Sequence, residues 1–248
     1  SGTLSPLESY RKYYFGDLPA VTCSLPNMFP KKNRLVLAAG DITTAFSMRE
    51  NRENRDRTAR YITTFSQLKG NVAVYFPSYQ ILDTYAQMLA HPLSRRNLII
   101  EPKDARDAGE ALRTFLSLPS QGKSGILFAV AGGKWSEGLD YRGELLSGAM
   151  VIGLPLAPYN RVRQMTIDYY RQRFGAEGEF ISYTLPALNR AQQAIGRVLR
   201  TPEERGVLVL GDRRFLEPRV KTGLPPWIRG ELVECNAESF SGAVKRWK

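Results

Sequence analysis

The chain of 248 residues is long enough for one large α/β domain, and its 43% of hydrophobic residues can fill a core. Its 35 lysines and arginines against 24 aspartates and glutamates give a net charge of +11, which indicates a polyanionic partner, with nucleic acid the first candidate. Two cysteines, one histidine and the absence of an apolar run of about 20 residues argue against a disulfide framework, a Cys/His metal site and a membrane span.

Short apolar runs alternate with helical patterns along the chain. Strands are predicted at 34–39, 71–76, 97–100, 125–130, 149–154 and 206–211. Helices are predicted at 55–69, 79–90, 105–118, 161–174 and between Pro186 and Pro202. Apolar strands that alternate with helices form parallel sheets covered on both faces, so the pattern predicts an α/β domain. Ligands of such sheets bind beyond the carboxyl ends of the strands, which makes the loops after 71–76 and 125–130 candidate sites.

The last predicted helix carries Gln193, Arg197 and Arg200 at offsets of four and seven residues. A helix repeats every ~3.6 residues, so this spacing predicts that the three side chains share one face. An ordinary solvated basic face has the same pattern, and a phosphate-binding face is the functional alternative. This stretch alone leaves both open.

The phosphate loop of a nucleotide enzyme is missing from the sequence. The nearest string, SLPSQGKS at 117–124, lacks the first glycine and precedes a predicted strand instead of following one, so we interpret it as a turn. An Asp-Glu-x-His box and a G-x-G-x-x-G fingerprint are also missing. We therefore expect that this chain cannot hold a triphosphate and its magnesium unaided.

The loop after the strand at 125–130 reads AGGKWSEGLDY, from Ala131 to Tyr141. Its glycines allow a close approach of the backbone to a ligand, and its Lys, Ser, Glu and Asp side chains supply charge and hydrogen-bonding groups. A plain glycine-rich turn between two strands is the alternative.

Four stretches resemble helicase motifs III, IV, V and VI of the XPD/DinG family in superfamily 2. They are SGTLSP (1–6), VAVYFPSYQIL (72–82), GGKWSEGLDY (132–141) and QAIGRVLR (193–200). The resemblance covers almost the whole chain in the family's order. It implies a RecA-like fold of the P-loop NTPase type, a three-layer domain with a mostly parallel central sheet. It also implies that residues 1–248 form the second of two motor domains, as a fragment of a longer protein.

The resemblance implies roles for individual residues. Arg197 and Arg200 match arginines that reach the γ-phosphate of a nucleotide held between the two motor domains. The residues that match the family's nucleotide side are Gln193, Glu137, Gly138 and Asp140. Those that match its DNA side are Arg49, Ser78, Tyr79, Lys134, Trp135 and Ser136. For Trp135, stacking on a base and packing in the core are both open.

The implied function is the second motor domain of an ATP-dependent 5′-to-3′ DNA helicase with a role in DNA repair. ATP and Mg²⁺ would be bound mainly by the first motor domain, so this chain alone should be inactive. A 4Fe-4S cluster needs four cysteines and would belong to the full-length protein, not to this chain. The implied partners are single-stranded DNA and the first motor domain. We expect a monomer in the cytoplasm of a prokaryote, associated with the nucleoid. The alternatives are a non-enzymatic basic module that binds single-stranded nucleic acid and, third, a small-molecule Rossmann enzyme.

Overall fold

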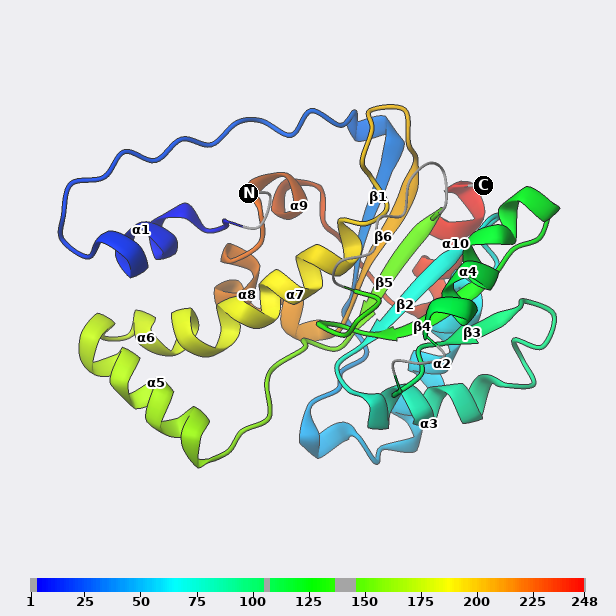
Figure 1. Ribbon diagram of the computed structural model, residues 1–248, viewed down its shortest axis with the longest axis horizontal. Coiled ribbons are helices and arrows are strands. Elements are labelled where there is room, and N and C mark those ends of the chain that lie inside the picture. The colour runs from blue at the N-terminus through cyan, green and yellow to red at the C-terminus, as the bar shows by residue number, and fades with distance from the viewer. Residues whose placement is uncertain (1–3, 105–107, 137–145, 248) are drawn as a thin grey trace.

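A seven-stranded parallel sheet forms the centre of the computed structural model, which describes residues 4–104, 108–136 and 146–247 (Figure 1). Its strands follow the order β3-β4-β2-β5-β6-β1-β7, and every neighbouring pair is parallel. The bounds are β1 Arg34–Ala39, β2 Val72–Phe76, β3 Leu98–Ile100, β4 Ile126–Val130, β5 Gly148–Ile152, β6 Gly206–Gly211 and β7 Val233–Cys235. The six predicted strands are confirmed, and β7 is an edge strand that the pattern did not predict.

Helices cover both faces of this sheet (Figure 1). One face packs against α2 (Arg52–Phe65), α3 (Tyr79–Leu89) and α10 (Ala237–Trp247). The opposite face packs mainly against α4 (Ala108–Ser117) and α7 (Leu185–Ile195). The remaining α-helices are α1 Leu7–Phe15, α5 Arg161–Phe174, α6 Glu177–Glu179, α8 Pro218–Thr222 and α9 Pro226–Glu231. This arrangement is the three-layer α/β domain that the alternation predicted.

Strand β2 shows why the central strands are apolar throughout. All five of its residues are buried. Ala73 and Tyr75 contact the core under α4 and α7, while Val72, Val74 and Phe76 contact the core under α2 and α3. Successive side chains of a strand point to opposite faces, so a strand covered on both faces needs an apolar residue at every position. Fully burying a side chain such as Phe76 contributes about 1.5–3 kcal/mol.

Helix α7 is shorter than predicted, because it ends at Ile195 and not near Pro202. Gly196 follows it as the C-cap, and its N–H donates to the Gln192 carbonyl at 2.8 Å. Glycine has a low helix propensity. Further on, the Glu204 carboxylate accepts the backbone N–H groups of Arg200 and Thr201, which removes those donors from any helical ladder. The prediction of one helical face for Gln193 and the two arginines was therefore wrong.

Candidate nucleotide and nucleic-acid site

The three motif VI side chains nevertheless meet at one cavity. Gln193 is an exposed residue in the last turn of α7, and Arg197 and Arg200 lie in the segment that follows this helix. All three line a cavity of about 370 Å³. The turn after Gly196 brings the arginines to the cavity without a common helical face. Permanent charge and a planar fork of donors suit a guanidinium to phosphate oxygens.

The opposite wall of this cavity is mostly apolar. It includes Phe29 and Trp227, the latter from α9. Arg34 fixes both, since its Nη1 donates to the Phe29 carbonyl at 2.7 Å and its guanidinium lies 4.7 Å from the Trp227 ring centroid. Arg34 also pairs with Glu231 through two nitrogens, at 2.6 and 2.7 Å, and both side chains are largely buried. The wall is thus held in place by a buried ion pair.

Arg197 also connects motif VI to the loop after β4. Its Nη2 donates to the Ser136 carbonyl at 2.8 Å. Inside that loop, the Ser136 hydroxyl accepts the Gly132 N–H at 2.7 Å and donates to the Gly133 carbonyl at 3.0 Å. Hydrogen bonds within the loop therefore fix its backbone, and Arg197 binds directly to that backbone.

Glu101 holds the same loop from the other side. This residue follows β3 and is only 2% exposed. Its carboxylate accepts the N–H of Val130 at 2.7 Å, the N–H of Trp135 at 3.3 Å and the hydroxyl of Tyr79 at 3.4 Å. Strands β3, β4 and β2 are neighbours and parallel, so their carboxyl ends meet at one edge of the sheet. Glu101 joins the segments that follow all three.

Gly133 must be a glycine for this arrangement. A Cβ atom at this position would come within 2.9 Å of Glu101 Oε1 and within 2.9 Å of the Val130 carbonyl oxygen. The neighbouring Gly132 has φ +82°, a conformation that other residues rarely adopt. The glycine pair therefore lets the loop pack directly over the buried carboxylate.

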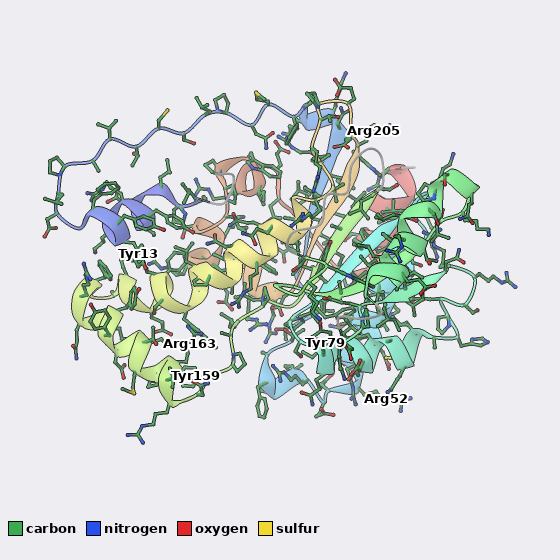
Figure 2. The ribbon with its side chains drawn as sticks, viewed as in Figure 1. Tyr13, Arg52, Tyr79, Tyr159, Arg163 and Arg205 are labelled. Atoms are coloured by element: carbon green, nitrogen blue, oxygen red, sulfur yellow. The ribbon has the colours of Figure 1, made fainter. Side chains whose placement is uncertain are left out.

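The predicted motif IV residues begin helix α3. Ser78 is its N-cap, and the serine oxygen accepts the Ile81 N–H at 3.4 Å. Tyr79 is the first helical residue and partly buried, and its hydroxyl bonds to Glu101. Burial and the neighbouring Glu101 carboxylate raise the pKa of the Tyr79 hydroxyl, which keeps it a neutral donor. In Figure 2 Tyr79 lies in the lower half of the molecule, where α3 begins.

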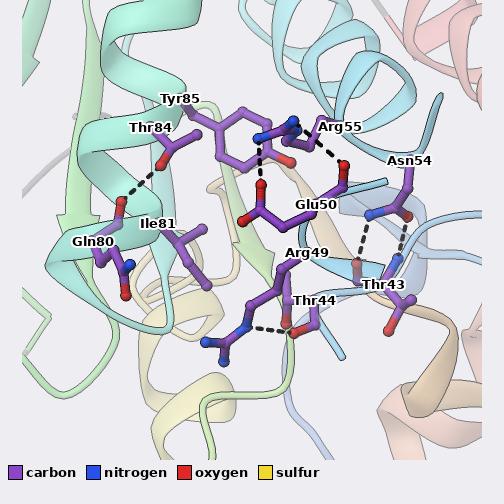
Figure 3. Close-up of a pocket in the computed structure, with 10 residues that line it drawn as sticks. All are labelled: Thr43, Thr44, Arg49, Glu50, Asn54, Arg55, Gln80, Ile81, Thr84 and Tyr85. Carbon is purple, nitrogen blue, oxygen red and sulfur yellow. Dashed lines mark hydrogen bonds and ion pairs between the residues drawn. The ribbon is translucent and has the colours of Figure 1, made fainter. Parts of the chain in front are cut away.

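Arg49 approaches this helix from the segment before α2 (Figure 3). It lines a small cavity of about 70 Å³ together with Gln80 and Ile81 of α3. Its Nε donates to the Thr44 carbonyl at 3.3 Å, and the side chain is exposed. The structure therefore brings Arg49 next to Gln80 and Ile81, which directly follow the predicted Ser78 and Tyr79, although about 30 positions separate them in the chain.

Asp212 supports the segment that carries Arg49. It follows β6, is fully buried and accepts the Thr44 N–H at 2.8 Å and the Thr43 hydroxyl at 3.0 Å. Arg214 donates to both of its oxygens, at 2.9 and 2.8 Å. Burial alone would raise the pKa of the Asp212 carboxyl, but the hydrogen bonds and charge of Arg214 with the Thr44 N–H outweigh it and hold that pKa below its usual range.

The remaining predicted residues divide into three groups. Lys134 is exposed on the loop after β4, where a phosphate could reach it. Trp135 and Ser136 are 2% and 1% exposed. The Trp135 ring lies in the core, so packing is the alternative that the structure adopts, and the Ser136 hydroxyl is engaged within its loop instead of facing solvent. The predicted nucleotide-side residues Glu137, Gly138 and Asp140 lie outside the described residues.

Sequence reasoning missed two positions that organise the site, Glu101 and Asp212. Each is a single acid directly after a strand, a signal that could have marked them as carboxyl-edge residues. In the described part of the chain, no group of three or more His, Cys, Asp or Glu side chains could hold a metal ion. No helix of that part is long and apolar enough to cross a membrane. Of the two cysteines, Cys23 is exposed and Cys235 is buried.

A family model described as the helicase C-terminal domain matches residues 61–231. The chain belongs to this family. One relative of this helicase domain is the general transcription and DNA repair factor IIH helicase subunit XPD/RAD3 of Saccharomyces cerevisiae, 29% identical over 95% of the chain and 32% of the relative. Another is the ATP-dependent DNA helicase chl1 of Aspergillus niger, 26% identical over 98% of the chain and 32% of the relative. The predicted resemblance to XPD-type helicases is confirmed. The chain spans about a third of the length of these relatives.

Solved structures share the fold of this helicase domain. A structure titled XPD helicase has a TM-score of 0.69 and 23% identity, covering 95% of this chain and 42% of that one. A structure titled XPD apo has a TM-score of 0.61 and 24% identity, covering 82% and 40%. These likenesses confirm the RecA-like α/β fold.

Proposed function

We propose that residues 1–248 form the second motor domain of an ATP-dependent 5′-to-3′ DNA helicase that acts in DNA repair. The observation that carries the proposal is the single cavity lined by Gln193, Arg197 and Arg200 in a chain of the helicase C-terminal domain family. The names of relatives support it, since they include a DNA repair helicase subunit and ATP-dependent DNA helicases.

On the nucleotide side, the cavity presents two guanidinium groups and an amide toward phosphate oxygens. Arg197 and Arg200 act as fingers on the γ-phosphate, a role worth ~10³–10⁵ in rate in related chemistry. ATP and Mg²⁺ supply the phosphoryl group and the charge neutralisation when bound, and the first motor domain holds most of their ligands. The residues of this chain orient the γ-phosphate and stabilise the charge that develops on it.

On the DNA side, Arg49, Ser78, Tyr79 and Lys134 form a track along the carboxyl edge of the sheet. Arg49 and Lys134 are exposed cations for backbone phosphates, Ser78 offers a hydroxyl at the start of α3, and Tyr79 fixes that start through its bond to Glu101. Trp135 and Ser136 support these residues indirectly. The Trp135 ring packs in the core, and the Ser136 hydroxyl holds the backbone of the Lys134 loop by hydrogen bonds. Contacts to the backbone alone make the binding insensitive to sequence.

The Ser136 carbonyl connects the two sides, because it accepts from Arg197 while its loop displays Lys134. A DNA strand that moves the Lys134 loop therefore shifts Arg197 at the nucleotide cavity. We further propose that the domain works as a monomer, in the cytoplasm and at the nucleoid of a prokaryote, with the first motor domain as its partner.

An unwinding assay with the complete protein tests the function. Duplexes with a 5′ or a 3′ single-stranded overhang are offered separately, with ATP and Mg²⁺. We expect unwinding of the 5′-overhang duplex only, and loss of most of that activity in the Lys134→Ala variant. ATP-independent binding without any strand separation on either substrate would favour the non-enzymatic binding module instead.

A further inference from the structure

A third cavity lies between helices α1, α5 and α7, and its lining residue Asn189 is one helical turn before Gln193 of the proposed nucleotide cavity. Helix α1 packs there against α5, and Figure 1 shows these helices beside α6, beyond the sheet. The cavity measures about 310 Å³, within the ~300–1,000 Å³ of sites that bind small ligands. Three helices and the turn before α7 supply its walls.

The helical spacing of its lining side chains shows one face of each helix turned inward. Tyr10 and Tyr13 are three residues apart on α1. On α5, Thr166 and Tyr170 come three and seven residues after Arg163. Ile181 and Ser182 come from η4 (Phe180–Thr184), a π-helical turn. π-Helical turns are rare and occur frequently at functional sites. Figure 2 shows Tyr13 on α1 and Arg163 on α5.

The tyrosine rings give the cavity an aromatic wall. Tyr13 and Tyr170 are nearly parallel, with an interplanar angle of 9° and centroids 5.9 Å apart. Their hydroxyls are 3.3 Å apart. Tyr13 is 38% exposed, so the face of the pair can be reached from solvent. Flat, accessible rings of this kind are the platforms on which nucleic-acid bases stack.

Arg163 is an arginine that the fold leaves without a counter-charge. Among the described residues it forms no ion pair, whereas Arg171 on the same helix pairs with Asp168 and Glu179. Its Nε is buried without an acceptor, and across the cavity the Asn189 side-chain oxygen is buried without a donor. A partly buried guanidinium that lacks an anion is costly, so this arrangement indicates a ligand that brings one.

We propose that this cavity binds one nucleotide unit, with its phosphate on Arg163 and its base against Tyr13 and Tyr170. The Asn189 amide then reads or steadies the base edge, as amides do in single-strand recognition. This inference rests on the proposed function, because that function brings single-stranded DNA to the chain. The unit is either a residue of a bound DNA strand or a free nucleotide, which carry the same phosphate and base.

The test measures binding of an oligothymidylate that contains 2-aminopurine, a fluorescent base whose emission falls on stacking. Arg163→Ala and Tyr170→Leu are compared with two controls on the same helix, Arg161→Ala and Tyr169→Leu. The control residues are exposed and do not line the cavity, yet they remove the same charge and the same ring. Circular dichroism melting shows that each variant is folded.

We expect Arg163→Ala and Tyr170→Leu to weaken binding by roughly tenfold each and to abolish the quenching, with changes under about twofold in the controls. Competition with thymidine monophosphate distinguishes a site for a DNA strand from a site for a free nucleotide. Competition by the mononucleotide identifies a site that also accepts free nucleotides, and its failure to compete assigns the site to the DNA strand.

Two outcomes overturn the inference in different ways. If folded Arg163→Ala and Tyr170→Leu bind like their controls while Lys134→Ala weakens binding, the cavity is no nucleotide site and the proposed function stands. If the wild-type chain binds neither ligand, both the cavity proposal and the DNA side of the proposed function fail.

Discussion

Replacing Glu101 by glutamine tests whether one buried carboxylate organises the proposed DNA track. The substitution keeps the size of the side chain and converts one of its two acceptor oxygens into a donor NH₂ group. In the wild type the two oxygens together accept from Val130, Trp135 and Tyr79. The Tyr79 hydroxyl can rotate to accept from the new amide, whereas a backbone N–H cannot.

The magnitude follows from the donors that are left over. The best arrangement of the amide keeps its oxygen on the Val130 N–H, which has the shortest bond at 2.7 Å, and leaves the Trp135 N–H facing an NH₂ group. An orphaned buried donor costs about 1–3 kcal/mol. We therefore expect Glu101→Gln to lower the free energy of unfolding by about 1–3 kcal/mol, and Glu101→Ala to lower it by about 2–6 kcal/mol, because it orphans both N–H groups.

Urea unfolding gives the stability, and fluorescence anisotropy with single-stranded DNA gives the affinity. Glu110→Gln on α4 is the control, since it makes the same change of charge at an exposed position. We expect Glu101→Gln to weaken DNA binding, although the loss of a negative charge alone would strengthen it as in the control, because the Lys134 loop and Tyr79 lose their shared anchor. Wild-type stability and affinity in Glu101→Gln would falsify this reasoning.

Three further predictions concern stability, catalysis and charge. Asp212→Asn should lower the free energy of unfolding by about 3–5 kcal/mol at pH 7, because it leaves Arg214 without its buried partner. The native pKa of Asp212 lies below its unfolded value of about 3.9. The stability difference between wild type and Asp212→Asn should therefore be complete above that pH and disappear as pH falls through the native pKa. A stability difference that is unchanged at pH 2 would contradict this. The 248-residue chain alone should show no Mg²⁺-dependent ATPase activity, because the first motor domain is proposed to hold most ligands of ATP and Mg²⁺. Robust ATP turnover by this chain, free of contaminants, would refute that proposal. In a salt series with single-stranded DNA, log K should fall with log salt at a slope of roughly −2 to −3. Lys134→Ala should reduce that slope by less than one unit and Ser78→Ala should weaken binding at an unchanged slope, whereas equal slopes in all three would argue against a phosphate contact at Lys134.

The central layers of the fold could be predicted from the sequence because burial on both faces leaves a strong signal. Strand β2 is buried at all five positions, and β4 and β6 resemble it. Strand β7 gives no such signal, because Val233 is 54% exposed at the edge of the sheet. The end of α7 was mispredicted, since the bonds from the Glu204 carboxylate to the backbone beyond Leu199 depend on a turn that no periodicity reveals.

The site was predictable where a motif spans neighbouring residues, and unpredictable where distant segments meet. The cavity that collects Gln193, Arg197 and Arg200 agrees with the expected proximity of these residues, although their roles remain predictions. Glu101 was missed because a single acid after a strand has no spacing pattern. The cavity at Arg163 was missed because it depends on the packing of α1 against α5, which lie about 150 residues apart in the chain.

The most direct test of the central claim is the DNA-stimulated kcat for ATP hydrolysis of the complete protein with Arg197→Ala or Arg200→Ala. Both arginines line the proposed nucleotide cavity, and both are only partly buried, so truncation should disturb the fold little. We predict that kcat falls by orders of magnitude in each variant, while the melting temperature and DNA affinity stay near the wild-type values. Wild-type kcat in both variants would show that these arginines form an ordinary solvated basic surface and not the fingers of a motor.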